Sequence, residues 1–320
     1  MEENGMNRLK YFPIMMFATV MGTTGLGLAF DRYDHLTHSS LGVGKYIIYA
    51  VSIWFCFISA VYLVKLIKYP AEVKAEFDHP VRINFFPAIS ISMLLLSAGL
   101  HPYQTGLSEI LCYGGAGLQI IFTYIIIRVW FYKDFKLLTT NPAWFIPVVG
   151  TILVPVAGKG ILHDDILWFF FSIGLILWPI LYAIIKYRLV FHEQLPPKLL
   201  PTKFIFIAPP AVGFIAYFKL TGSLDPFSRI LYFFALFTTI MLFTMFRRFY
   251  SVPYFVSWWA YTFPMDAIAI ATLVMYNLTG NIFYKYLGGF FLIAATLVVA
   301  HVLFYSLVNA VKGNICIPEH

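Results

Sequence analysis

Hydrophobic residues in this chain form long runs that contain no Asp, Glu, Lys or Arg, and short polar segments separate the runs. Most runs are 17 to 26 residues long, for example the 20 residues from Tyr11 to Phe30. A helix of about 20 apolar residues crosses a bilayer, whereas spanning β-strands would show a period-two alternation, which is absent. The pattern predicts an all-α membrane protein with ten transmembrane helices, at residues 11–31, 44–66, 83–101, 108–128, 139–158, 165–185, 203–219, 228–246, 253–276 and 286–311.

The ninth expected span comes from a stretch of 36 residues between Arg248 and Lys285 with a single charge, Asp266. Two spans there would need a turn at Asp266 without a polar loop around it, so we expect one. No polar segment is long enough to form a soluble domain. We therefore expect one transmembrane channel domain over residues 1–320.

Prolines divide the expected spans into two alternating kinds. Every odd span contains proline, whereas among the even spans only the sixth does, at Pro179. Proline frees backbone carbonyls that neighbours or water must satisfy, so five equivalent broken helices favour a shared cavity. We expect five helical hairpins, with an inner ring of five proline-kinked odd helices around a central pore and an outer ring of five even helices. The alternative is that the prolines only kink buried helices. The odd-span prolines are Pro13, Pro87, Pro147, Pro155, Pro209, Pro210 and Pro264.

Charged residues make up only 12% of the chain, against about 25% in soluble domains, which excludes a soluble globular fold. With the N-terminus inside, 16 of the 22 Lys and Arg residues, Arg247 and Arg248 among them, fall on the inner side. This bias predicts cytoplasmic termini. The net charge of +7 then reflects orientation, and we expect no nucleic-acid partner. The six basic residues on the outer side are Arg32, Lys45, Lys159, Lys219, Arg229 and Lys285.

The spans carry no enzyme motif. A membrane aspartyl protease needs two intramembrane carboxylates and only one is present, and neither G-x-S-x-G nor H-E-x-x-H occurs. His35 and His38 fall in an expected outer loop without a third ligand, so no metal site is expected. We expect neither an enzyme nor a cofactor. The first span is too long for a signal-peptide core, so we expect it to remain uncleaved.

Asp266 is the only acid at mid-membrane depth, where ionisable groups are costly and often functional. It could exchange protons, as a coupled transporter requires, or it could pair with a backbone or hydroxyl group near Thr262 or Thr272. No Lys or Arg lies well inside a span. A pore here would therefore lack fixed cations and favour anions that dehydrate easily.

Phenylalanine precedes proline at three of the expected helix breaks. An aromatic ring at such a break could close a cavity. The chain contains 33 phenylalanines, so the pattern alone does not choose among them. The three pairs are Phe12-Pro13, Phe86-Pro87 and Phe263-Pro264.

The string SWWAYTFPM at residues 257–265, with RINFF at residues 82–86, resembles the family of bacterial TehA tellurite-resistance proteins, plant guard-cell slow anion channels and yeast malate permeases. The ten spans and the opening Phe12-Pro13 agree along nearly the whole chain. The plant pattern continues after F-P-M with threonine, where this chain has Asp266.

The resemblance implies a homotrimer in which each protomer has its own pore, occluded by Phe263 as the gate. Phe85 or Phe86 is implied, less directly, as a second constriction, and Phe12 and Asp266 are further candidates for the pore wall. We expect an anion channel for small monovalent anions such as chloride or nitrate, in contact with membrane lipid in a bacterial inner membrane. The alternative is a proton-coupled transporter for dicarboxylates or related oxyanions that uses Asp266 as its proton site.

Overall fold

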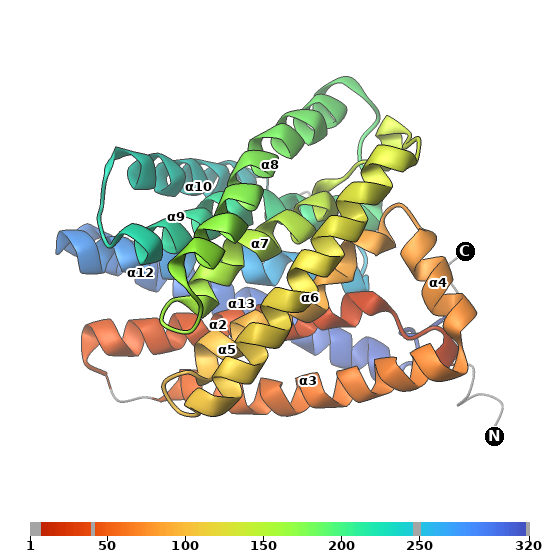
Figure 1. The fold of residues 1–320 in the computed structure, drawn as a ribbon, viewed down its shortest axis with the longest axis horizontal. Helices are drawn as coiled ribbons and strands as arrows, with labels where there is room; N and C mark the ends of the chain where they lie inside the picture. The colour runs from red at the N-terminus through yellow and green to blue at the C-terminus, as the bar shows by residue number, and fades with distance from the viewer. Residues whose placement is uncertain (1–7, 40–41, 246–250, 318–320) are drawn as a thin grey trace.

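The computed structural model describes residues 8–39, 42–245 and 251–317, and its long elements are all helices (Figure 1). Arg247, Arg248 and the last residue of the span expected at 228–246 lie outside the described residues. The long helices are α2 (Phe17–Thr37), α3 (Val43–Lys68), α5 (Pro87–Leu100), α6 (Thr105–Tyr132), α7 (Phe145–Gly158), α8 (Asp164–Phe191), α9 (Ala208–Thr221), α10 (Pro226–Thr244), α12 (Thr262–Thr279) and α13 (Ile282–Val311).

Within the described residues, eight helices are long and apolar enough to cross a membrane, and the protein is an integral membrane protein. Helix α7 is apolar but shorter. Helix α12, which contains Asp266, is not among the eight, so the count of ten spans stays a prediction. The eight segments are Ile14–Thr37, Val43–Lys68, Arg82–Leu100, Thr105–Tyr132, Asp164–Phe191, Pro197–Thr221, Pro226–Thr244 and Ile282–Val311.

The helices differ sharply in burial. The apolar windows of Arg82–Leu100 and Pro197–Thr221 are 83% and 100% buried, whereas those of Val43–Lys68 and Ile282–Val311 are 22% and 28% buried. Helices α7 and α12 are buried along almost their whole length. We call α2, α5, α7, α9 and α12, with the 3-10 segments that precede them, the buried helices. The other long helices expose apolar side chains, as a surface facing lipid requires.

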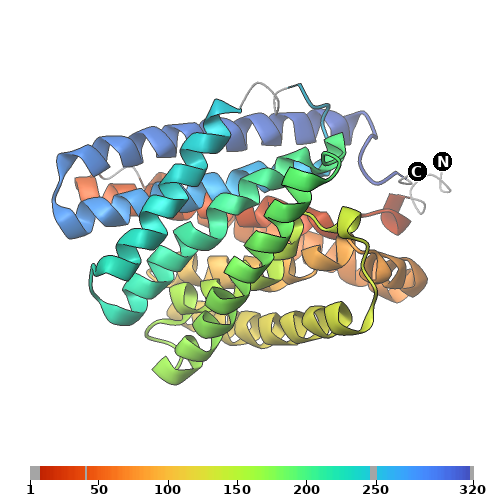
Figure 2. The same ribbon diagram turned by 90° about the horizontal axis from the view of Figure 1, so that it is seen from above.

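Contacts between helices follow the chain. Each buried helix packs against the long helix that comes next in sequence, as α2 does against α3 and α12 against α13. The buried helices also pack against one another, in the pairs α2 and α5, α5 and α7, α7 and α9, α9 and α12, and α12 and α2. Figure 2 shows the long helices packed together, with the green helix α8 and the teal helices α9 and α10 inclined to the blue helix α13.

A 3-10 segment precedes each buried helix. In α5, α7, α9 and α12 a proline lies in the first turn of the α-helix, whereas Pro13 precedes the 3-10 segment before α2. Pro87 is the first residue of α5, and Pro264 is the third residue of α12. Proline fits the first turn of an α-helix because the amide it lacks has no partner there. These prolines therefore mark helix starts, and Pro155 alone among the odd-span prolines lies deep inside an α-helix. The 3-10 segments are η1 (Ile14–Met16), η2 (Arg82–Phe85), η4 (Pro142–Trp144), η5 (Pro197–Ile207) and η6 (Val256–Tyr261).

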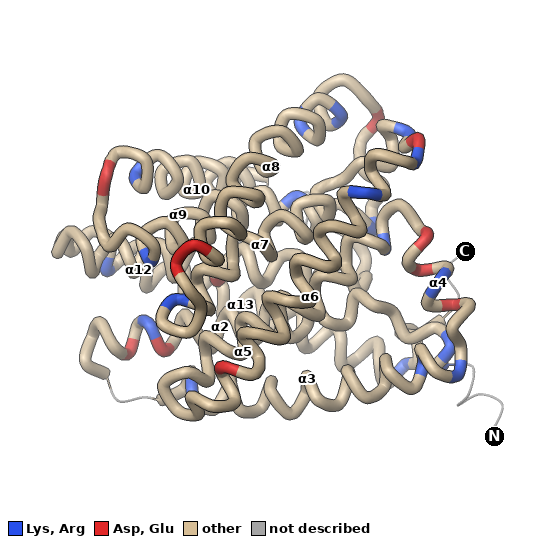
Figure 3. Tube along the Cα trace, viewed as in Figure 1, with Lys and Arg blue, Asp and Glu red and all other residues tan. Residues whose placement is uncertain are grey.

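Charged residues gather toward the two ends of the helices and leave the middle of the chain trace almost without charge (Figure 3). Arg8 and Gly313, near the two ends of the described chain, lie beside each other, because a Cβ added to Gly313 would come within 2.7 Å of the Arg8 guanidinium. The orange segment that holds the short helix α4 (Pro70–Asp78) lies at one end of the molecule (Figure 1). The hydrophobic pattern did not predict α4 because this helix is amphipathic and polar.

Candidate functional site

Two cavities lie one after the other between the buried helices. The smaller has a volume of about 30 Å³, room for roughly one water, and the larger has a volume of about 330 Å³. All five buried helices contribute to both walls. The smaller cavity is lined by Ala18, Met21, Phe85, Ile91, Ile146, Val149, Ile205, Ala208, Trp259, Ala260, Phe263 and Pro264.

The two linings show that the buried helices run in the same direction. The smaller cavity is lined by residues near the helix starts, such as Ala18 of α2 and Ile146 of α7. The larger cavity reaches residues near the helix ends, such as Arg32 of α2 and Lys219 of α9. The N-terminal ends of the buried helices therefore surround the smaller cavity, and their C-terminal ends surround the larger one.

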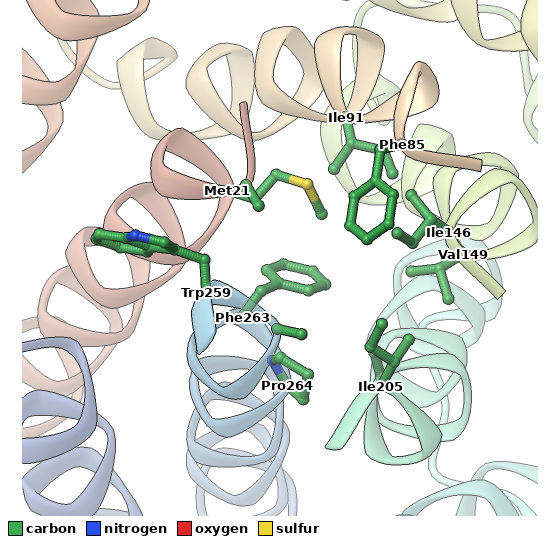
Figure 4. Close-up of a pocket in the computed structure, with 12 residues that line it drawn as sticks. Met21, Phe85, Ile91, Ile146, Val149, Ile205, Trp259, Phe263 and Pro264 are labelled. Carbon is green, nitrogen blue, oxygen red and sulfur yellow. The ribbon is translucent and has the colours of Figure 1, made fainter. Parts of the chain in front are cut away.

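Phe263 lies between the two cavities, and among the described residues it alone lines both. It is the second residue of α12, directly after η6 and before Pro264. The change from 3-10 to α-helix points its ring into the space between the helices. Figure 4 shows the ring at the centre, surrounded by Met21, Phe85 and Val149 from three other buried helices. Phe263 is 7% exposed and lies where the two linings meet.

The larger cavity contains charge that the sequence analysis did not expect. Arg32 and Lys219 both lie in its wall, with Asp31 and His35. The expectation of a passage without fixed cations is therefore wrong for this cavity. His35 was expected in a loop, but it lies in the last turn of α2. Lys219 donates a hydrogen bond from Nζ to the carbonyl oxygen of Val156, at 2.7 Å.

Tyr103, in the connection between α5 and α6, contacts the acid of this wall. Its hydroxyl group donates to Oδ2 of Asp31 at 3.4 Å. Burial, together with the negative charge of Asp31, raises the pKa of Tyr103. The phenol therefore stays protonated and remains a donor to the carboxylate at neutral pH.

The other candidate phenylalanines lie in different places. Phe85 lines the smaller cavity. Phe86 is not in either lining and packs its ring against Tyr62, Phe77 and Phe122, with ring centroids 5.0 to 6.4 Å apart. Phe12 is also outside both linings. The pore roles of these residues stay predictions, and the geometry places only Phe85 beside Phe263.

Asp266 lies inside the helix packing and outside both cavity linings. It is fully buried, and neither carboxyl oxygen has a hydrogen-bond partner among the described residues. Its side chain lies against Gly25 of α2, where an added Cβ would come within 2.7 Å of Oδ2. One turn earlier, Thr262 lies even closer to Gly22. The glycines of α2 thus let α12 approach, and the pairing of Asp266 with Thr262 or Thr272 is absent from the described hydrogen bonds.

A buried ionic network lies at the start of α2, and the sequence analysis missed it. Lys65 Nζ contacts Glu76 Oε2 at 2.9 Å, with the two side chains only 2% and 6% exposed. Tyr62 donates to the same oxygen at 2.8 Å. The network also holds the backbone before α2, because Lys65 donates to the carbonyl of Phe12 at 2.8 Å and Ile14 N donates to Glu76 Oε1 at 3.3 Å. Only the fold-back of α4 onto α3 brings the two charges together, and the hydrophobic pattern carries no signal for that.

No cluster of three or more His, Cys, Asp or Glu side chains that could hold a metal ion occurs in residues 8–39, 42–245 and 251–317.

A family of known proteins matches this chain along most of its length. A family model described as voltage-dependent anion channel matches residues 11–307. The S-type anion channel SLAH3 of Arabidopsis thaliana is 32% identical over 79% of this chain, and SLAH2 of the same plant is 30% identical over 93%. The tellurite resistance protein TehA homolog of Haemophilus influenzae is 26% identical over 87% of this chain and 85% of its own length. The chain spans only 40% and 59% of the two plant relatives.

Proposed function

Because the chain belongs to the voltage-dependent anion channel family, we propose that it conducts small monovalent anions such as chloride and nitrate, with Phe263 as the gate. The observation that carries this proposal is the position of the Phe263 ring between two cavities that both draw their walls from all five buried helices. In this state the ring separates the cavities, so conduction requires that it move aside. Phe85, across the smaller cavity, narrows the same passage.

In this proposal the pore runs inside one protomer. An inner ring of five helices surrounds the pore, and an outer ring of five helices encloses the inner ring. Two observations support the arrangement. The helices α2, α5, α7, α9 and α12 contact one another in a closed ring, since α12 packs against α2. These helices are also far more buried than those that follow them in sequence. The exposed apolar faces of the outer helices contact lipid or neighbouring protomers of a homotrimer.

The proposed orientation places both termini in the cytoplasm of a bacterium, with the chain in the inner membrane. The distribution of basic residues supports it, since 16 of 22 fall on that side of the expected spans. The smaller cavity then lies toward the cytoplasm, and the larger one opens toward the outer side.

The test is current through the purified protein in a planar bilayer under asymmetric chloride and nitrate. Phe263→Ala removes the ring and is expected to raise the conductance at least several-fold over wild type. Phe86→Ala is the matched control, because it removes the same ring from a site that lines neither cavity. A Phe263→Ala protein that conducts no more than wild type would overturn the gate.

A proton-coupled transporter of dicarboxylates or related oxyanions is a second candidate, and the buried carboxyl of Asp266 favours it. A charge without a partner in this position is costly, so we expect the neutral form at rest. Flux would then require a pH gradient and would vanish in Asp266→Asn, which cannot exchange the proton. Flux that continues without a pH gradient and survives Asp266→Asn would exclude this mechanism.

A further inference from the structure

The wall of the larger cavity combines a mainly apolar surface with a small group of charges. Its ionisable residues are Asp31, Arg32 and His35 from α2 and Lys219 from α9, and every other residue of the wall is uncharged. A volume of about 330 Å³ is roughly that of ten waters. A small anion with part of its hydration shell fits in this space.

The helix ends around this cavity oppose the entry of an anion. Helices α2, α5, α7 and α9 line this cavity with residues of their last turns, and the C-terminal end of a helix carries about half a negative charge. An anion arriving from this side therefore meets an unfavourable field. Arg32 and Lys219 lie in this same wall, where their positive charges offset the helix ends.

The two cations also have unused hydrogen-bond donors. Lys219 uses one of its three N–H donors on the carbonyl of Val156. Arg32 has no hydrogen bond or ion pair among the interactions of the described residues, and its buried Nε has no partner. Both cations line the same cavity. Neighbouring cations with free donors at the wall of a cavity suit an anionic acceptor.

The one acid of this wall is directed toward other groups. Asp31 Oδ2 accepts from Tyr103, and Oδ1 lies where a Cβ on Gly44 of α3 would overlap it. The carboxylate is thus held against α3 and the α5–α6 connection. His35 adds to the positive side only when protonated. The cavity wall therefore carries a net positive charge.

We propose that Arg32 and Lys219 form a binding site for one small monovalent anion, such as chloride or nitrate, in the larger cavity. The site rests on the proposed channel function for its role, since it would collect the anion on the expected outer side of Phe263. Binding itself needs no conduction, which separates the two proposals experimentally.

The binding test uses the full-length protein in detergent and the line width of the chloride NMR signal, which broadens when chloride exchanges with a protein site. The variants are Arg32→Gln, Lys219→Gln and the double variant. Removing one charge is expected to raise the chloride concentration at half-maximal broadening roughly three- to tenfold. Arg229→Gln is the matched control, because Arg229 is an exposed basic residue on the same expected side that does not line the cavity. An elution profile unchanged from wild type shows that each variant is folded.

The result that supports the site is a shift in both single variants, a larger shift in the double variant, none in the control, and displacement of chloride by nitrate. An unchanged titration in the double variant would overturn it. So would displacement by succinate at far lower concentrations than by nitrate, because the site would then select a dianion.

Conductance of the Phe263→Ala channel at increasing chloride concentration separates the site from the channel. If the charge variants shift chloride binding but Phe263→Ala carries no current, the site stands and the channel fails. If Phe263→Ala conducts and the half-saturating concentration is the same with and without Arg32 and Lys219, the channel stands and the site fails.

Discussion

Charged side chains lie near both ends of helix α2, but their surroundings differ. At its start, Lys65 and Glu76 form a buried pair in which the neighbouring donors and acceptors satisfy one another. Near its other end, Arg32 faces a cavity without a partner among the described contacts. The first arrangement fixes the backbone ahead of α2. The second leaves donors directed at a space that a small ion can enter.

In a chain with few charges, structural charges differ from functional ones in what surrounds them. A buried pair contributes mainly through what its loss leaves behind, an isolated charge in an apolar site. Neutralising a cation that lines a cavity costs little folding stability, because water reaches the side chain. Substitutions in the buried pair at the start of α2 should therefore lower stability. Substitution of the cation near its other end should weaken anion binding.

The largest effect is expected from Glu76→Gln. It leaves the buried Lys65 charge without its counter-ion and should lower the free energy of unfolding by about 3–5 kcal/mol. Thermal unfolding of the purified protein in detergent measures this. The double variant Lys65→Met, Glu76→Gln removes the stranded charge and should recover part of the loss. Wild-type stability in Glu76→Gln alone would remove the distinction between the two ends.

Between the two ends, α2 packs against α12 through Gly25, and Gly25→Ala should have the next largest effect. The added Cβ would lie 2.7 Å from Oδ2 and 3.0 Å from Cβ of Asp266. Overpacking of this kind costs about 1–3 kcal/mol, measurable in the same unfolding experiment. Combining it with Asp266→Ala frees the space and should restore most of the loss. No rescue in that pair would contradict the contact.

A half-buried acid with two hydrogen-bond donors gives a smaller, pH-dependent effect on stability. Asp225 accepts from Ser228 N at 2.8 Å and from the Tyr217 hydroxyl at 2.6 Å. These hydrogen bonds lower the pKa of Asp225 below its ordinary value of 3.8. Its contribution to stability is therefore present above that value and is lost as the pH falls through the lowered pKa. Asp225→Asn should lower the unfolding temperature slightly at pH 7, and the difference from wild type should disappear in acid. A difference that persists unchanged in acid would contradict the assignment.

The smallest effect on stability is expected from Arg32→Gln. No hydrogen bond or ion pair of the described residues is lost, so the free energy of unfolding should stay within about 0.5 kcal/mol of wild type. Measured beside Glu76→Gln, this variant sharpens the contrast between the two ends of α2. A loss as large as that of Glu76→Gln would show that Arg32 is a structural charge.

The helical fold could be predicted from the sequence, and so could the interruption of the odd spans at proline, because both depend on local sequence. Runs free of charge mark helices that cross a membrane, and a proline such as Pro87 or Pro264 must lie where an amide has no helical partner. What the prolines do could not be predicted as well. Pro87, Pro147, Pro209 and Pro264 lie at the change from 3-10 to α-helix, and this change depends on how the preceding segments pack.

The candidate site was predictable only in part. The string around Phe263 indicated that residue through a family resemblance. Arg32 and Lys219 were missed because spans were bounded where charges begin, which assigned Arg32 to an outer loop and Lys219 to the outer end of a span. Asp266 was recognised as buried, but the side of the helix that carries it was not. Helix rotation depends on the close approach of α12 to Gly25, which only the three-dimensional packing shows.

The most direct test of the gate is a graded series at one position, Phe263→Leu, Phe263→Val and Phe263→Ala, with single-channel conductance measured in symmetric chloride. We expect the conductance to rise stepwise as the side chain at position 263 becomes smaller. The same series at Phe86 should change the conductance little. Equal conductance across the Phe263 series, or an equal rise in the Phe86 series, would contradict a gate formed by the Phe263 ring.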